Sequence, residues 1–443
     1  MASAAEQLAA NLNFSAFAKA DELKKRIWFT LGALVVYRLG TYIPLPGIDP
    51  SVWSQVFRQQ AGGILGMFNM FSGGGIDRMA IFALNIMPYI SAAIILQLLQ
   101  SVSPKLEALK KEGEAGRKVI NQYTRYLTLV LAALQAYGIA IGLQGAGNVV
   151  SQPGPFFLLS TTITLTGGTM FLMWVGEQIT ARGIGNGISL IIMAGIVAEL
   201  PSAIVGTLEL GRQGALSTGL ILGILVMAVA VIGIIVFVER AQRRLLIQYP
   251  KRQVGNKMFE GQSSHLPLKL NTSGVIPPIF ASSLLLLPGT VANFNAGAGP
   301  EWFQWLTTQL SHGRPAYLIL YLGMIVFFTF FYTAVVFNPT ETADNLKKHG
   351  GFIPGIRPGE RTAEYIDYVL SRITVVGAIY LALVCLVPEI LISYASVPFY
   401  FGGTSLLIVV SVTMDTVAQV QGYLLAHQYE GLIRKSKGKG RRR

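Results

Sequence analysis

Residues 217–238 read STGLILGILVMAVAVIGIIVFV, an apolar run without a charged side chain. A helix of about 20 such residues crosses the roughly 30 Å hydrocarbon core of a bilayer. Because the apolar residues are continuous and do not alternate with polar ones, the run predicts a transmembrane helix and not a barrel strand. Nine further stretches are predominantly apolar and long enough to span. In chain order, the ten expected spans are 24–43, 76–101, 123–143, 155–178, 187–207, 217–238, 274–292, 316–337, 372–393 and 403–425.

The composition supports an all-α polytopic membrane protein. Of the 443 residues, 52% are hydrophobic and 13% are charged, whereas soluble domains carry about 25% charged residues. Such a chain has too few polar side chains to cover a water-facing surface, which excludes a disordered protein and a protein that coats nucleic acid. The single cysteine, Cys385, excludes an internal disulfide and a paired-cysteine zinc site. Its apolar neighbours indicate a packing residue.

The net charge of +13 is concentrated on one side of the ten spans. If the N-terminus is cytoplasmic, 30 of the 35 Lys and Arg residues fall in cytoplasmic segments, and the outer loops hold only Arg58, Arg212 and Arg314. This asymmetry follows the positive-inside rule and supports both the number of spans and their orientation. We therefore expect both termini in the cytoplasm. The charge needs no nucleic acid as the main partner, although a ribosome could also use it.

Two pairs of short segments indicate an internal duplication. MPYISAA at 87–93 resembles IPPIFAS at 276–282, and GISLII at 187–192 resembles GTSLLI at 403–408. Together the matches pair span two with span seven and span five with span ten. A duplication of five spans gives two inverted five-helix halves with the functional path at their interface. The expected organisation is a cytoplasmic segment 1–26, an N-terminal half 27–207, a C-terminal half 208–425 and a basic cytoplasmic tail 426–443.

One apolar stretch is too short to span. Residues 61–72, AGGILGMFNMFS, are uncharged and are followed by three glycines and then by Asp77 and Arg78. This pattern is typical of a short re-entrant helix that enters the protein from the outer side and is hinged on glycines. A surface-lying amphipathic segment or a buried loop would give the same pattern.

No enzyme signature is present. The chain contains no HExxH, GxSxG or GxxxxGK[ST] motif. Gly183, Gly185 and Gly187 lack the context of a nucleotide-binding loop and indicate a tight turn between spans four and five. The four histidines lie in loops or at a helix end, which argues against a metal cluster or a proton relay. We predict a protein that is not an enzyme and that holds no metal ion or cofactor.

Four charged residues lie within or near the ends of spans. Arg38, Glu177 and Glu199 lie toward span ends, where interfacial pairing explains them. Asp415 lies deeper, and we interpret it more readily as a hydrogen-bond partner of a neighbouring helix than as an ion-coupling group. A secondary transporter with an essential Asp415 remains an alternative. A non-conducting membrane scaffold is a second alternative.

Isoleucines occupy the paired positions of the repeat. Ile86 and Ile90, and likewise Ile188 and Ile192, are four residues apart and share a helix face. For any single isoleucine, packing or lipid contact is the simpler explanation. The repeat pairs two of them with isoleucines of spans seven and ten, which favours a shared role. A ring of stiff, branched apolar side chains excludes water and offers no hydrogen bonds to a defined solute, which suits an unfolded polypeptide.

Two cytoplasmic loops, 239–272 and 338–372, are long, basic and rich in turn residues, as in GGFIPGIRPGE at 350–360. Short linkers would be enough to join helices. The loops therefore indicate either a docking platform for a cytoplasmic partner or solvated segments that only set the topology. The tail 434–443 has seven basic residues, and we expect it to be disordered and to contact anionic lipid or RNA.

A set of specific motifs extends over about residues 20–430. They are IPLPGID (43–49), MFNMFSGG (67–74), IMPYISA (86–92), KKEGEAGRK (110–118), QYTRY (122–126), GEQITARGIGNGIS (176–189), HLPLK (265–269), GVIP (274–277), FNPTETADNLKK (337–348), PGIRPGE (354–360) and YFGGTSLLIVV (400–410). These motifs closely resemble the SecY family, the central subunit of the bacterial protein-conducting channel. The resemblance implies a gated channel in the cytoplasmic (inner) membrane that passes unfolded secretory proteins. It also implies lateral opening between spans two and three and spans seven and eight, which releases transmembrane helices into lipid.

The resemblance also implies roles for individual residues. The pore ring falls on Ile86, Ile90, Ile188, Ile192, Ile279 and Ile408. The plug falls on about 63–77, with Gly63, Ile64, Leu65, Gly66, Met67, Phe68, Asn69, Met70, Phe71, Ser72, Gly73 and Gly74 as its candidate residues. Partner docking falls on Arg357, with Lys347, Lys348, Arg361, Arg252 and Lys257 as further candidates. Polar candidates at the lateral gate are Ser91, Gln97 and Asn271.

The partners implied by the resemblance are the small subunits SecE and SecG, the SecA ATPase or a translating ribosome, the unfolded precursor with its signal sequence, and the lipid bilayer. The chain departs from the family in its first long loop, where Asn256-Lys257 stands in place of a basic pair. This departure leaves open how much of the docking that loop performs.

Overall fold

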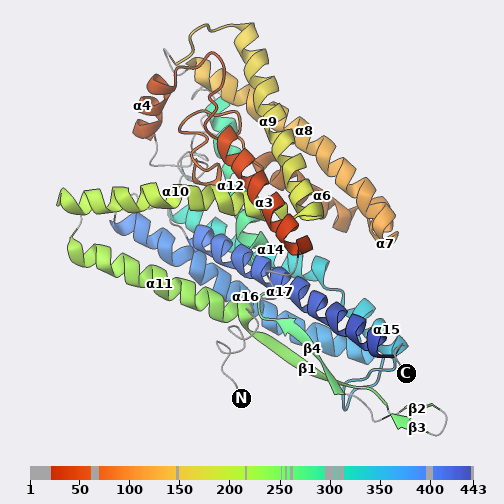
Figure 1. The fold of residues 1–443 in the computed structure, drawn as a ribbon. Helices are drawn as coiled ribbons and strands as arrows, with labels where there is room; N and C mark the ends of the chain where they lie inside the picture. The colour runs from red at the N-terminus through yellow and green to blue at the C-terminus, as the bar shows by residue number, and fades with distance from the viewer. Residues whose placement is uncertain are drawn as a thin grey trace.

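The computed structural model describes residues 21–60, 69–145, 149–214, 217–250, 252–254, 257–259, 263–294, 305, 309, 314–395 and 403–440. Within these residues, one helix corresponds to each of the ten expected spans (Figure 1). They are α3 (Asp21–Gly40), α6 (Met87–Val102), α8 (Glu114–Gly145), α9 (Pro155–Arg182), α10 (Gly187–Arg212), α11 (Thr218–Arg240), α12 (Ile276–Phe294), α14 (Pro315–Val336), α16 (Glu360–Ala395) and α17 (Gly403–Gly440).

Seven of the described helices are long and apolar enough to cross a membrane by themselves. The apolar helices at Met87–Val102 and Ile276–Leu285 are shorter, and α3 begins with the charged sequence DELKKR. The strongly apolar helix α11 buries only Ile224, Val231 and Ile235 within the protein. Most of its other large apolar side chains are exposed, among them Leu222, Val229 and Phe237, as expected for a helix whose solvent is lipid.

Span two begins later than the sequence predicts. The expected span starts at residue 76, but α6 starts at Met87, and residues 72–86 form turns. The backbone explains the difference, because Gly73, Gly74 and Asn85 have φ angles of 65°, 79° and 48°. These left-handed conformations interrupt a right-handed helix. Pro88 then lies in the first turn of α6, where its missing N–H leaves no helix hydrogen bond unmade.

Helices of the first half of the chain pack on those of the second half along one interface. In the first half, α8 packs against α6 and α9, and α9 packs against α10. In the second half, α14 packs against α12 and α16, and α17 packs against α11 and α16. Across the interface, α6 packs on α12 and α10 packs on α17. These are the two pairs of helices that carry the matched segments of the repeat.

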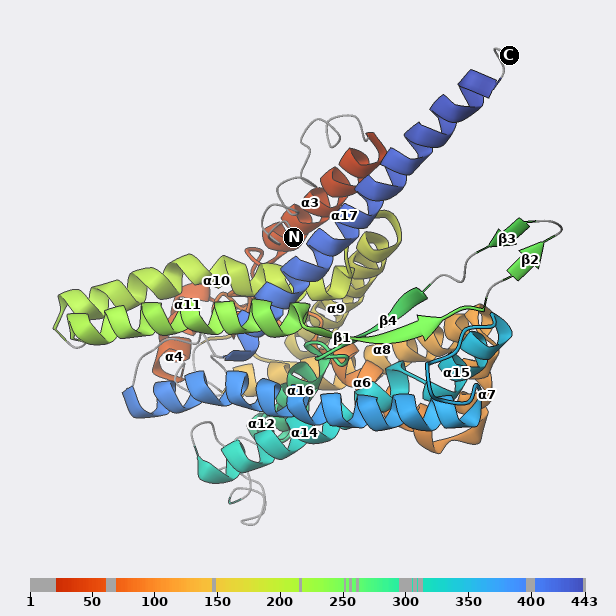
Figure 2. The ribbon, with the colours of Figure 1, turned by 90° about the horizontal axis from the view of Figure 1, so that it is seen from below.

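The two long loops contain secondary structure that the sequence analysis did not predict. In the first loop, β1 (Gln242–Gln248) pairs antiparallel with β4 (Ser263–Lys269), and β2 (Arg252–Val254) pairs with β3 (Lys257–Phe259). Figure 2 shows β2 and β3 projecting beyond the helices, past the ends of β1 and β4. The second loop contains the short helix α15 (Pro339–Lys348). Two further short helices, α4 (Pro50–Gln60) and α7 (Pro104–Lys111), lie in other loops.

The two long loops are joined to each other and to α16. Gln248 and Phe352 exchange two backbone hydrogen bonds, of 2.9 Å and 3.0 Å. Below this bridge, a small apolar core combines Leu245 and Leu268 of the hairpin with Ile353 of the second loop and with Ile366 of α16. We call this unit, residues 242–248, 263–269 and 339–373, the loop platform. Its buried core distinguishes it from a pair of solvated linkers.

Candidate functional site

The six isoleucines predicted for the pore ring gather at the interface between the two halves of the chain. Ile86, Ile90, Ile192 and Ile408 are between 0% and 5% exposed and belong to one apolar cluster. Ile188 and Ile279 are partly buried and pack against the same cluster. The side chains come from the start of α6, from α10, from α12 and from α17. Segments separated by more than 300 residues thus meet in one apolar layer.

The six isoleucines of this layer have no hydrogen-bonding group in their side chains, and four of them are buried. Branched aliphatic side chains in this arrangement present a surface that water wets poorly. Their χ1 angles are restricted, so they fill space with little rearrangement. The layer can obstruct ions and water, and it offers nothing with which to select a polar solute.

The predicted plug is described from Asn69 onward, and Gly63 to Phe68 lie outside the described residues. Residues 69–71 are helical, and residues 70–76 are buried. Phe71 belongs to the same apolar cluster as the ring. The Ser405 hydroxyl of α17 donates to the Met70 sulfur at 3.6 Å. The described end of the segment therefore lies inside the protein, and the alternative of a surface-lying segment is wrong for these residues.

The three polar residues predicted for the lateral gate lie in two places. The Ser91 hydroxyl donates within α6 to the Met87 carbonyl oxygen at 3.2 Å, and the buried Gln97 Oε1 has no partner among the described residues. Asn271 precedes α12 and donates to Glu239 Oε1 at 2.7 Å and to the Gly274 carbonyl oxygen at 3.0 Å. No described hydrogen bond joins Asn271 to the other two. Because α12 packs on both α6 and α8, the helices at the predicted gate are in contact.

The predicted docking residues lie on the loop platform or on the strands beside it. Lys347 and Lys348 occupy the last turn of α15, and Arg357 and Arg361 are exposed on the PGIRPGE segment and the start of α16. The Arg357 carbonyl oxygen accepts a hydrogen bond of 2.9 Å from the Thr362 hydroxyl. This bond fixes the backbone of Arg357 and does not involve its guanidinium group. The remaining candidates, Arg252 and Lys257, belong to β2 and β3, and their side chains lie outside the described residues.

Asp415 is more exposed than the sequence analysis expects. Its carboxylate is 4.0 Å from the Lys269 ammonium, and the two side chains are 73% and 62% exposed. Lys269 ends β4, which belongs to the first long loop. The predicted hydrogen bond to a neighbouring helix is wrong, because the partner is a strand residue at the surface.

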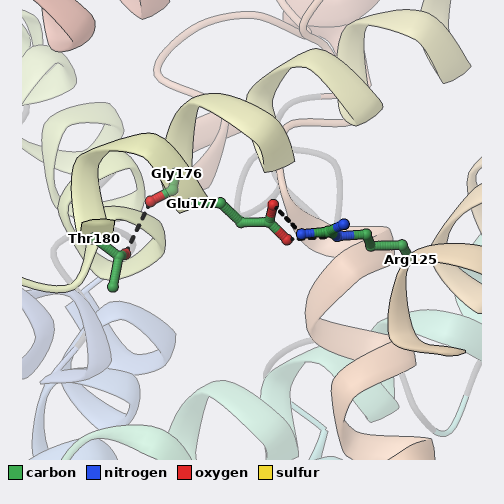
Figure 3. A network of polar contacts seen from close by, with 4 residues as sticks. All are labelled: Arg125, Gly176, Glu177 and Thr180. Atoms are coloured by element: carbon green, nitrogen blue, oxygen red, sulfur yellow. Dashed lines mark hydrogen bonds and ion pairs between the residues drawn. The ribbon is translucent and has the colours of Figure 1, made fainter. Parts of the chain in front are cut away.

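Glu177, for which the sequence predicts interfacial pairing, forms an ion pair between α9 and α8 with Arg125, a partner that was not predicted. Arg125 donates from Nε and Nη2 to the two carboxylate oxygens of Glu177, at 2.9 Å and 2.7 Å (Figure 3). One turn further along α9, the Thr180 hydroxyl donates to the Gly176 carbonyl oxygen at 2.9 Å. The sequence contained a signal for this pair. Arg125 lies near the start of one span and Glu177 near the end of the next, and these ends of consecutive antiparallel spans lie side by side.

The described residues also hold no group of three or more His, Cys, Asp or Glu side chains arranged for a metal ion. The elements of the site are therefore an apolar constriction between two sets of membrane helices, a buried segment packed against it and a basic platform on one side. These elements define a class of protein, the gated membrane channels.

Comparisons with known proteins identify the family. The SecY family model matches residues 80–417, and the chain belongs to the SecY family. It is 58% identical to the protein translocase subunit SecY of Vibrio cholerae over 425 residues, which covers 95% of this chain and 96% of that protein. It is 56% identical to the SecY subunit of Escherichia coli K12 over 423 residues, with 95% and 96% covered.

Solved structures of low sequence identity share the fold. One, described as the structure of a protein conducting channel, has a TM-score of 0.63 at 17% identity and covers 91% of this chain and 93% of that chain. A second concerns the plug domain of the SecY protein, which stabilises the closed state of the translocation channel. It has a TM-score of 0.61 at 18% identity, with the same coverage.

Proposed function

We propose that the chain is a gated protein-conducting channel whose constriction is the cluster of six isoleucines. It passes unfolded secretory polypeptides across the cytoplasmic membrane and releases transmembrane segments sideways into lipid. The observation that carries this proposal is the apolar layer between the two halves, with Phe71 and the ring isoleucines in one buried cluster. A path lined in this way imposes no hydrogen-bond pattern on what passes, so chains of any sequence can use it.

In this proposal the parts of the site have separate roles. The segment from Gly63 to Gly74 obstructs the resting constriction, and α6 and α8 separate from α12 and α14 when a transmembrane segment leaves. Since the chain hydrolyses nothing, the energy comes from a cytoplasmic driver bound to the loop platform, either the SecA ATPase or a translating ribosome. SecE and SecG complete the channel in the membrane. Both termini of the chain lie in the cytoplasm, as the distribution of Lys and Arg supports.

Site-specific crosslinking tests the path. A photoreactive residue at Ile279 is combined with a stalled, radiolabelled secretory precursor in membranes. We expect a crosslink to the precursor that appears only when the chain is stalled. A matched probe at Ile319, which is 72% exposed on the outer face of α14, should crosslink to lipid instead. Crosslinks from Ile279 only to lipid or neighbouring helices, with the precursor demonstrably engaged, would refute the pore assignment.

The transporter alternative makes a different prediction about Asp415. Its pair with Lys269 is 4.0 Å long and largely exposed, and such pairs contribute about 0–1 kcal/mol to stability. We expect Asp415→Asn to leave precursor translocation within about fivefold of the unmodified protein, because a contribution of at most about 1 kcal/mol corresponds to that factor. The measurement is the initial rate of translocation into proteoliposomes. Complete loss of activity with a folded protein would favour an ion-coupled carrier.

A further inference from the structure

Three side chains from outside the plug hold three consecutive carbonyl groups of its described end. Asn85 Nδ2 donates to the Phe71 carbonyl oxygen, and the Tyr37 hydroxyl donates to the Ser72 carbonyl oxygen at 3.2 Å. Arg38 Nη1 donates to the Gly73 carbonyl oxygen. Tyr37 and Asn85 are 1% and 2% exposed, so both bonds are shielded from water. We call Tyr37, Arg38 and Asn85 the plug clamp.

The clamp satisfies groups that the local backbone leaves without partners. The chain turns at Gly73 and Gly74, which have φ angles of 65° and 79°, so the carbonyls of 71–73 point away from any continuing helix. A buried carbonyl without a partner is strongly unfavourable. Since each of the three finds a side-chain donor, this turn is stable only while the clamp is in place.

The segment also lies directly on α10. A Cβ added to Gly195 would meet the Phe71 carbonyl oxygen at 2.7 Å and the Tyr37 hydroxyl at 2.9 Å. No side chain therefore separates the plug backbone from this helix. The same helix carries Ile192 of the ring, three residues before Gly195. The clamp thus holds the plug against an element of the constriction itself.

The donors are positioned for this contact. The Tyr37 ring stacks on Phe82 with centroids 6.5 Å apart and an interplanar angle of 12°. Arg38 also donates to the Tyr42 hydroxyl at 2.9 Å. Asn85 has a φ of 48°, a strained conformation for a residue with a side chain, and such strain concentrates at functional positions. Asn85 immediately precedes Ile86, the first isoleucine of the ring, so the bond to Phe71 links the plug to the start of α6.

We propose that the plug clamp sets the balance between the closed and the open channel. This proposal rests on the proposed function, in which a polypeptide passes through the isoleucine ring. Phe71 packs in the cluster that holds the ring, and Met70 accepts a hydrogen bond from Ser405 of α17. An entering polypeptide therefore displaces both residues, and the bonds to the carbonyls of Phe71 and Ser72 break. These bonds exist only in the closed state, and removing a donor therefore raises the open fraction.

The test measures how often the plug leaves its buried position. Ser72, which is 1% exposed, is replaced by cysteine in a Cys385→Ser background, so that the introduced thiol is the only one. The full chain is purified with the subunits that accompany it and reconstituted into proteoliposomes. The rate of labelling by a membrane-impermeant maleimide then reports the fraction of time that residue 72 is exposed.

Two substitutions remove single donors with little other change. Tyr37→Phe removes only the hydroxyl and keeps the ring stacked on Phe82. Asn85→Gly removes the amide, and glycine adopts a positive φ without strain. We expect the labelling rate to rise about fivefold for each lost neutral hydrogen bond, and roughly 25-fold in the double variant if the effects are independent. Tyr380→Phe is the matched control, because that buried hydroxyl has no hydrogen-bond partner among the described residues.

The possible outcomes distinguish failure of the clamp proposal from failure of the proposed constriction. Unchanged labelling in Tyr37→Phe and Asn85→Gly would overturn the clamp, as would an equal rise in Tyr380→Phe. Should Asn85→Gly fail to fold, Tyr37→Phe alone decides. Ring variants are measured for ion conductance in the same preparation. Conductance from the ring variants without any labelling effect refutes only the clamp, whereas ring variants that do not conduct refute the proposed constriction.

Discussion

Replacing Ile90, Ile192 and Ile408 together with serine is expected to make the resting channel conduct small ions. Burying one isoleucine side chain is worth about 1.5–3 kcal/mol. Three serines therefore remove several kcal/mol from the free energy that keeps water out of the constriction, and their hydroxyls bind water directly. At about 1.4 kcal/mol for each factor of ten, the lower end of this range, about 4.5 kcal/mol, corresponds to a rise in resting conductance on the order of a thousandfold. Single-channel recording in planar bilayers measures this.

The control uses the same substitution at isoleucines of the outer face. Ile163, Ile234 and Ile319 are 62%, 52% and 72% exposed, and serine there should leave the conductance at background. Both triple variants are compared by thermal unfolding, since loss of buried apolar contacts also lowers stability. A ring variant that folds and remains as tight as the unmodified protein would remove these isoleucines from the constriction.

The second large effect is expected from Arg357→Glu. This residue is exposed on the loop platform, and only its backbone takes part in a described local hydrogen bond, from Thr362. The substitution reverses a charge that a cytoplasmic driver would contact, and like charges across an interface are strongly unfavourable. We expect driver-dependent translocation to fall by an order of magnitude or more, consistent with loss of a dominant arginine contact. The melting temperature should not change.

The matched control is Arg314→Glu, which makes the same charge reversal away from the loop platform, at the N-terminus of α14. Translocation and binding of the driver to proteoliposomes are measured for both variants. Normal translocation by Arg357→Glu would exclude this residue from the docking site. An equal defect in Arg314→Glu would show that the assay responds to net charge and not to docking.

The sequence predicted the membrane helices well because their signal is local. A run such as 217–238 is long, apolar and uncharged, and α11 follows it closely. The start of span two was missed, because hydropathy does not register backbone conformation. Residues 76–86 are mostly apolar and were therefore included in the span, but Gly73, Gly74 and Asn85 have positive φ angles. Only their three-dimensional context, with Asn85 donating to Phe71, explains why the helix begins at Met87.

The sequence left the two long loops open as a docking platform or as solvated segments, and it predicted no secondary structure in them. In β1 the side chains of Leu245 and Ile247 are buried and the residues between and around them are exposed, an alternation typical of a strand. The pattern was overlooked because the segment was interpreted as a loop on the basis of its basic residues. Its partners, β4 and Phe352, lie about 20 and 100 residues away in the chain, and no local signal connects them.

The proximity of the ring isoleucines could be inferred from sequence, because the repeat pairs Ile90 with Ile279 and Ile192 with Ile408. Their role as a constriction stays a prediction. The plug clamp could not be predicted from sequence. Its donors are Tyr37 and Arg38 of α3 and Asn85 before α6, and its acceptors are the backbone carbonyls of the turn at 71–73. Arg38 was noted only as a charge near a span end, and Tyr37 and Asn85 carried no signal. Contacts of this kind depend on how packed helices bring loops together, and a single sequence does not encode them in any periodic pattern.

The length of α16 has a mechanical consequence. Its 36 residues form a rod of about 54 Å at 1.5 Å per residue. One end begins in the platform, where Ile366 is fully buried. Further along, the backbone at Val384 lies so close to Gly403 of α17 that even a methyl group there would collide with it. A driver that displaces the platform would therefore move α16 as one rigid helix. Through the contact between Val384 and Gly403, α16 would transmit this displacement to α17, the helix that carries Ile408.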